Sequence, residues 1–148
     1  MGADRGRQRP RDRLGRPLPW GTPGVEPVPE EALPPDRALA LARDLLLQGR
    51  PFGAHEVLEA VWKAAPDADR DFWQGLAQLC VGITHAERGN AIGAGRLIER
   101  AAQRLAATED IATRHGVDLA SVIAWARAGL TDSRTRRLPV GWPAPDRG

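Results

Sequence analysis

The side chains best suited to chemistry begin on a segment that the sequence predicts to be the second helix of the chain. His55 and Glu59 are four residues apart, so they share one face of a helix, and Glu56 lies beside them near the positive end of that helix. Trp62 continues the same strip. Imidazole and carboxylate groups can bind polar ligands, exchange protons or coordinate a metal ion. This strip is therefore where we expect a site.

A second polar strip lies on the following predicted helix. Gln74 and Gln78 are four residues apart, and His85 follows seven residues later, about two turns further along the same face. A short link should make the two helices antiparallel, so that the strips face each other across a groove. Because buried polar groups need partners, we expect Glu59 to lie opposite Gln78 and His55 to lie near His85.

Four interpretations of these residues stay open. They form a hydrogen-bonded network that holds the helices in register, a ligand pocket, a divalent-metal site, or a set of solvated side chains. The candidate metal ligands are His55, Glu59 and His85, with Glu56 as the alternative carboxylate. A zinc-peptidase helix requires a second histidine four residues after the first, and this chain has Glu59 there. Peptidase chemistry is therefore disfavoured.

The elements that must position these residues are indicated by a segment that occurs twice. Residues 49–59 and 89–99 share their glycine, alanine, aliphatic and glutamate positions at a spacing of 40 residues. The glycine that opens each copy is suited to end one helix just before the next begins. The His-Glu pair of the first copy is replaced by Gly95-Arg96 in the second. The sequence thus predicts two similar helical hairpins, of which one alone carries the polar pair.

Helical spacing of apolar residues predicts an all-α fold, a compact bundle of about five helices built from these two hairpins and one further helix. Proline at a first helical position and Asn or Asp at a cap mark the starts. The expected helices run from Pro35 to about Gln48, from Pro51 to about Ala64, from Asp67 or Asp69 to Gly89, from the cap Asn90, and from the cap Asp118.

Composition limits where the protein works. The chain has 148 residues and a single cysteine, Cys80, so it forms no internal disulfide and contains no zinc-finger spacing. We therefore expect a reducing compartment, the cytoplasm, and an inert core thiol. Since no apolar run approaches the roughly 18 residues of a membrane span, we expect no membrane contact.

The two ends differ in composition from the middle. Residues 1–34 predict an irregular arm rich in Arg and Pro, residues 35–130 a helical domain, and residues 131–148 an irregular tail. Residues 21–130 carry 15 acidic and 11 basic side chains, so the excess of positive charge belongs to the ends. We expect Trp20 and Trp142, one in each Pro-rich end, to dock in grooves on the bundle.

Several motifs together resemble the domain-of-unknown-function family 309 of bacteria and archaea. They are Phe-Gly-Ala-His-Glu-Val-Leu-Glu at 52–59 with Trp62, Asp-Phe-Trp-Gln-Gly-Leu-Ala-Gln at 71–78, His85, and Gly89-Asn90 followed by Gly93-Ala94. The resemblance covers residues 36–106, with residues 118–125 as an extension. It implies a small all-helical protein and assigns no reaction.

These residues support one expected function and two alternatives. We expect a module that binds a protein partner or a small polar ligand in the groove lined by His55, Glu56, Glu59, Trp62, Gln74, Gln78 and His85. The first alternative is a metal-dependent hydrolase in which a divalent ion activates water. The second is nucleic-acid binding through the arginines of residues 5–16, which Asp4, Asp12 and the acidic body make less favourable. The identity of the ligand and the presence of catalysis stay open. The oligomeric state also stays open, and a homo-oligomer is one of the options.

Overall fold

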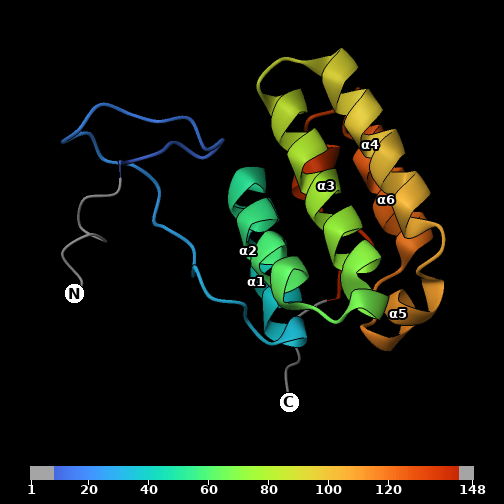
Figure 1. Cartoon of the computed structure of the whole chain (residues 1–148). Helices are drawn as coiled ribbons and strands as arrows, with labels where there is room; N and C mark the ends of the chain where they lie inside the picture. Colours follow the sequence, from blue (N-terminus) through green and yellow to red (C-terminus); the bar gives the residue numbers. More distant parts are fainter. Residues whose placement is uncertain (1–8, 144–148) are drawn as a thin grey trace.

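The computed structural model describes residues 9–143, and within that range it is all-helical, which confirms the predicted fold class (Figure 1). Six α-helices follow one another: α1 (Pro35–Leu47), α2 (Pro51–Ala64), α3 (Arg70–Glu87), α4 (Ala91–Leu105), α5 (Glu109–Arg114) and α6 (Leu119–Ala128). Two single 3-10 turns add to them, Asp67–Asp69 before α3 and Thr135–Arg137 after α6. No helix in this range is both long and apolar enough to cross a membrane.

Most helix boundaries follow the local signals of the sequence. Pro35 and Pro51 occupy the first positions of α1 and α2, where a proline costs no backbone hydrogen bond. The Asn90 side chain accepts a hydrogen bond from the Gly93 amide at 3.0 Å, and Asp118 caps α6 in the same way. Asp69 precedes α3 but makes no capping bond. Its carboxylate faces Arg114 instead, at 3.4 Å.

The short helix α5 was not predicted from the sequence. It spans six residues, of which only Ala112 is buried, so it has no repeating apolar face to reveal it. Thr108 precedes it but makes no cap, because its hydroxyl donates to the Leu105 carbonyl at 2.8 Å. The prediction of about five helices therefore missed one turn-and-a-half of helix between α4 and α6.

The core is centred on α3, which lies between the α1–α2 hairpin and α4, with α6 against α4 on the far side (Figure 1). Its buried side chains include Phe72, Trp73 and Leu76. A Cβ added at Gly82 would lie 2.8 Å from Cγ1 of Ile98, so α3 and α4 approach each other closely there. Cys80 is fully buried, and this burial raises the pKa of its thiol, in agreement with an unreactive core cysteine.

The two tryptophans of the ends behave differently. Trp142 is 5% exposed and packs edge-on against Trp125, with ring centroids 6.2 Å apart, as expected for a docked side chain. Trp20 is 61% exposed, so its predicted docking is wrong. The residue of the N-terminal segment that does dock is Leu14, which is 1% exposed.

The N-terminal segment, residues 9–34, is called the arm below. It is irregular and lies beside α2 and the top of α3 (Figure 1). The Asp12 carboxylate holds its tip as a tight turn by accepting from the Leu14 and Arg16 amides, both at 2.9 Å. Two backbone hydrogen bonds hold the segments of the arm together, one from the Leu18 amide to the Pro10 carbonyl and one from the Val25 amide to the Arg11 carbonyl. The division of the whole chain into arm, helical domain and tail stays a prediction.

Candidate functional site

The polar pair of the second helix forms as a direct contact within α2. Nε2 of His55 lies 2.8 Å from Oε2 of Glu59, and Nζ of Lys63 lies 2.9 Å from the other carboxylate oxygen. The hydrogen bond from Lys63 lowers the pKa of Glu59, with burial opposing and the nearby His55 adding to the shift. Glu59 is therefore an ionised carboxylate held between two donors.

His55 has one satisfied and one unsatisfied nitrogen. Since Nε2 faces the Glu59 carboxylate, it carries the proton and donates. Nδ1 is buried and has no hydrogen-bond partner in the described part of the chain. The ring packs against Phe52 one turn earlier, with centroids 5.4 Å apart. The imidazole is thus wedged into the helix surface rather than presented to solvent.

The predicted residues of the third helix turn to other neighbours. Gln78 accepts from Nε of Arg104 at 3.2 Å, and the same guanidinium binds Asp71 at 2.9 Å, so this strip faces α4. His85 lies at the end of α3, where its Nδ1 is 3.3 Å from Nδ2 of the Asn90 side chain. Gln74 and Trp62 are half-buried. The expected contact between Glu59 and Gln78 is therefore not formed.

The candidate metal ligands are not brought together as a set. His55 and Glu59 touch, whereas His85 contacts Asn90 at the far end of α3. Throughout residues 9–143, no three His, Cys, Asp or Glu side chains gather closely enough to hold one metal ion. The two polar strips thus serve two different helix contacts.

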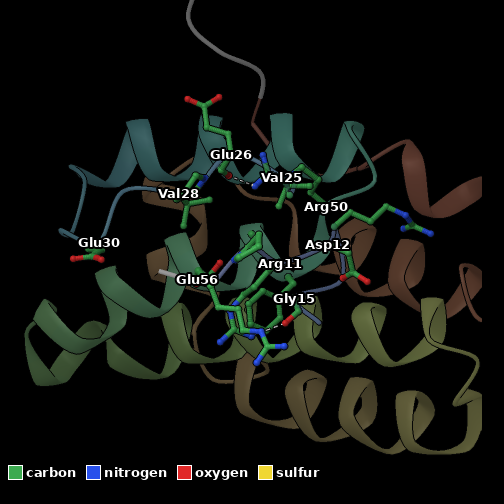
Figure 2. A pocket seen from close by; sticks show the side chains of 16 residues that line it. Arg11, Asp12, Gly15, Val25, Glu26, Val28, Glu30, Arg50 and Glu56 are labelled. Atoms are coloured by element: carbon green, nitrogen blue, oxygen red, sulfur yellow. Dashed lines mark hydrogen bonds between the residues drawn. The ribbon is translucent and has the colours of Figure 1, made fainter. Parts of the chain in front are cut away.

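A cavity of about 500 Å3 lies elsewhere, between the arm and the start of α2, and is called the arm cavity below (Figure 2). It is lined by Arg9, Pro10, Arg11, Asp12, Arg13, Gly15, Gly24, Val25, Glu26, Pro27, Val28 and Glu30 of the arm and by Arg50, Phe52, Gly53 and Glu56 at the start of α2. Of the seven residues predicted to line the groove between the second and third helices, Glu56 alone is among them.

The arm is fastened where its tip meets the α1–α2 turn. Nη1 of Arg13 donates to the Gly49 carbonyl at 3.1 Å, and Arg88 at the end of α3 donates to the Leu14 carbonyl. Gly15 has a φ of 79°, and a Cβ built there would lie 2.5 Å from the Phe52 ring. Only glycine permits this approach, so the tip lies directly on the ring.

Glu87 joins the arm to the C-terminal segment. Its carboxylate lies 3.7 Å from Nη1 of Arg13 and 3.5 Å from Nη2 of Arg136, and the Glu87 and Arg136 side chains are almost buried. Arg136 also donates to the Gly129 carbonyl. One acidic side chain at the end of α3 therefore steadies both ends of the described chain.

Charges of both signs meet in the arm cavity. Burial raises the pKa of Glu56, while His55, Arg11 and Arg50 act in the opposite direction and Glu59 adds to the rise. Glu56 is still exposed to solvent, so the rise in its pKa reflects partial burial of the carboxyl and not full enclosure. Figure 2 shows Glu56 from α2 and Arg11 from the arm among the side chains that line this space.

A smaller depression adjoins the arm cavity along α2. It has a volume of about 210 Å3 and is lined by Val28, Pro29, Glu30, Glu56, Glu59, Ala60 and Lys63. Val28, Glu30 and Glu56 line both spaces. The outer face of α2 is therefore partly covered by the arm over two helical turns, and Glu59 enters the site from this side.

The sequence did not predict that the arm forms a wall of the cavity, because the arginines and prolines of the arm suggested a solvated segment. One signal was present. Leu14 is an aliphatic residue between arginines, preceded by Asp12 and followed by Gly15, which is the pattern of a tight turn that displays one apolar side chain. The side chains of Arg5 and Arg7, invoked for nucleic-acid binding, lie outside the described residues.

A known family matches α2, α3 and parts of α1 and α4, and this match does not include the arm. Residues 39–97 match the family described as Domain of unknown function (DUF309), which confirms the resemblance seen in the sequence. The chain is 39% identical over 70 residues to the uncharacterized protein YpuF of Bacillus subtilis (strain 168). That match covers 44% of this chain and 40% of YpuF, so the chain spans less than half of this curated relative. No solved structure matches the chain. The region of this chain that is similar to the DUF309 family thus runs from α1 to the first half of α4.

Proposed function

We propose that the protein is a binding module that takes a small polar ligand in the arm cavity. The observation that carries this proposal is the cavity itself, a space of about 500 Å3 with charged side chains of both signs on its wall. Small-molecule sites commonly measure 300–1,000 Å3 and contain a few convergent polar groups. A ligand of metabolite size suits this volume better than a protein partner does.

The His55–Glu59 pair supports the site from α2. With Nε2 bonded to Glu59 and the ring against Phe52, His55 fixes the surface on which the arm tip rests. Glu59 also reaches the adjoining depression, beside Glu56. The groove predicted between the second and third helices, with Gln74, Gln78 and His85 as ligand contacts, stays a prediction to which the observed hydrogen bonds add no support.

The test is a binding experiment with a defined readout on the wall. The full chain, labelled with 15N, is titrated at millimolar concentration with a panel of small carboxylates, phosphates, amines and amino acids. We expect at least one class to shift amide signals of residues 9–30 and 50–56 in a saturable manner. Shifts centred on Gln78 and Arg104 instead, or no saturable shift in either segment, contradict the proposal.

Matched variants separate a ligand effect from a general loss of structure. Glu56→Gln changes the charge of the cavity wall, and Arg96→Gln changes an exposed charge on α4, outside the arm cavity. We expect the first to change the affinity about tenfold, since one charge-assisted hydrogen bond contributes roughly 1.5–3 kcal/mol. We expect the second to leave it unchanged. Equal effects of both variants would show that the shifts reflect non-specific charge attraction.

A further inference from the structure

Two arginines that line the arm cavity, Arg11 and Arg50, donate hydrogen bonds to backbone carbonyls. Nη1 of Arg11 donates to the Gly15 carbonyl at 2.6 Å, and Nη2 of Arg50 donates to the Glu26 carbonyl. A guanidinium has five N–H donors, so each of these side chains is held in place with donors to spare. Nε of Arg50 is buried and has no acceptor within residues 9–143. Both guanidinium groups are thus positioned by the fold without being satisfied by it.

The carboxylate that shares this cavity wall, in contrast, is not held by the fold. Glu56 makes no ion pair and no hydrogen bond among the described residues, although Arg11 and Arg50 lie near enough to act on its charge. Glu59, one turn further along the same helix, differs, because His55 and Lys63 both bind it. Opposite charges that share a cavity but do not pair with each other leave both available to a ligand.

Resting on the function proposed above, we propose that the ligand of the arm cavity is a small zwitterion that carries an amine and an acid group. Its acid group is bound by the guanidinium groups of Arg11 and Arg50, and its ammonium group by the carboxylate of Glu56. A molecule with a single charge satisfies one side of the cavity and leaves the other unpaired, which costs free energy on partial desolvation. A zwitterion satisfies both.

The experiment compares probes that differ only in their charged ends. One set is β-alanine, propionate and propylamine, and a longer set is ε-aminocaproate, caproate and hexylamine. Affinities for the full chain are measured by isothermal titration calorimetry and by the amide shifts of residues 9–30 and 50–56. In at least one set, we expect the zwitterion to bind about tenfold more tightly than either partner, the effect of one charge-assisted hydrogen bond.

Variants assign each charge to its end of the ligand. Glu56→Gln should abolish the tighter binding of the zwitterion relative to the acid. Arg11→Gln or Arg50→Gln should reduce the tighter binding of the zwitterion relative to the amine. Arg96→Gln on α4 should change neither, and circular dichroism with thermal melting checks that each variant is folded. Two separate Arg variants are included because each guanidinium also holds a different carbonyl of the arm, that of Gly15 for Arg11 and that of Glu26 for Arg50.

The outcomes distinguish this inference from the function on which it rests. Binding of propionate or caproate as tightly as the matching zwitterion, with shifts at the arm cavity, would overturn the zwitterion and leave a small-ligand site. The same holds for equal binding of the amines. If no probe shifts the cavity residues while the wider panel of ligands does, the zwitterion is again wrong. If neither does, both proposals fail.

Discussion

The α1–α2 turn and the α3–α4 turn are built alike and used differently. Gly49 has a φ of 72° and Gly89 a φ of 88°, the left-handed conformation that glycine adopts without strain. The amide that follows each glycine bonds back to the carbonyl five residues earlier, at 2.8 Å from Arg50 and 2.9 Å from Asn90. Both helices therefore end in the same glycine motif. Whether the two hairpins are copies of one repeat stays a prediction.

What differs is the segment that covers each turn. At the first, the arm tip lies on Phe52 and hydrogen-bonds to Gly49. At the second, Ile92 occupies the place of Phe52 in the predicted alignment and is 74% exposed, and nothing lies within 4 Å of a Cβ built at Gly89. This turn geometry does not by itself make a site. The cavity exists because the arm packs on Phe52 and Gly49 at the first turn, whereas near the second turn it contacts Arg88 at the end of α3.

The largest effect should come from removing the contact that docks the arm. Leu14→Ala deletes a fully buried side chain and should lower the free energy of unfolding by about 2–3 kcal/mol, within the usual range for such substitutions. Ile92→Ala at the uncovered turn should change it by less than about 0.5 kcal/mol. Urea unfolding followed by circular dichroism measures both. Similar values for the two variants would mean that the covered and uncovered turns do not differ.

An intermediate effect should appear at the feature that the two turns share. Gly89→Ala forces an alanine into a left-handed conformation in open space, so its cost is that of the backbone alone, about 1–2 kcal/mol. Gly49→Ala should cost at least as much, because Gly49 is also buried beneath Arg13. Thermal and urea unfolding of both variants check this. A neutral Gly89→Ala would contradict the left-handed geometry of the uncovered turn.

The smallest effect concerns charge beside the covered turn. Folding raises the pKa of Glu56, so its contribution to stability is fully present below the unfolded pKa and is lost as pH rises through the folded pKa. Glu56→Gln should therefore stabilise the protein at pH 7 by no more than about 0.5 kcal/mol, since the side chain is largely solvated. Below about pH 4 the difference should vanish.

Arg96→Gln is the matched control, because residue 96 holds the corresponding position after the second turn and stays charged throughout this pH range. Its effect on stability should not depend on pH between 3 and 7. Urea unfolding at several pH values compares the two variants. A stabilisation by Glu56→Gln that persists unchanged at low pH would show that the carboxyl is not perturbed by folding.

Much of the helical fold could be predicted because its signals are local. A proline at the first position of α2, the side-chain cap at Asn90 and the glycine after α1 each act within a few residues, and each is found where the sequence places it. The helix α5 has no such signal, since it buries one alanine and lacks a side-chain cap. Local chemistry thus predicts boundaries, and fails where a short helix is held by its neighbours.

The candidate site was less predictable because its contacts span long stretches of sequence. The i to i+4 pair of His55 and Glu59 follows from helix geometry alone and is formed. The partner of Gln78 proved to be Arg104 on α4, because small rotations of a helix decide which neighbour a side chain meets. The bond between Arg88 and the Leu14 carbonyl joins residues 74 positions apart, and no pattern along the chain indicates it.

Nuclear Overhauser effects between Gly15 and Phe52 show whether the arm rests on the α1–α2 turn. The chain has two phenylalanines, so the Phe52 ring signals can be assigned without ambiguity. We predict strong cross-peaks from the Gly15 α-protons to the Phe52 ring, because the two groups are in contact. A Phe52 ring that shows cross-peaks to His55 but none to Gly15 would contradict this contact, and with it the arm cavity.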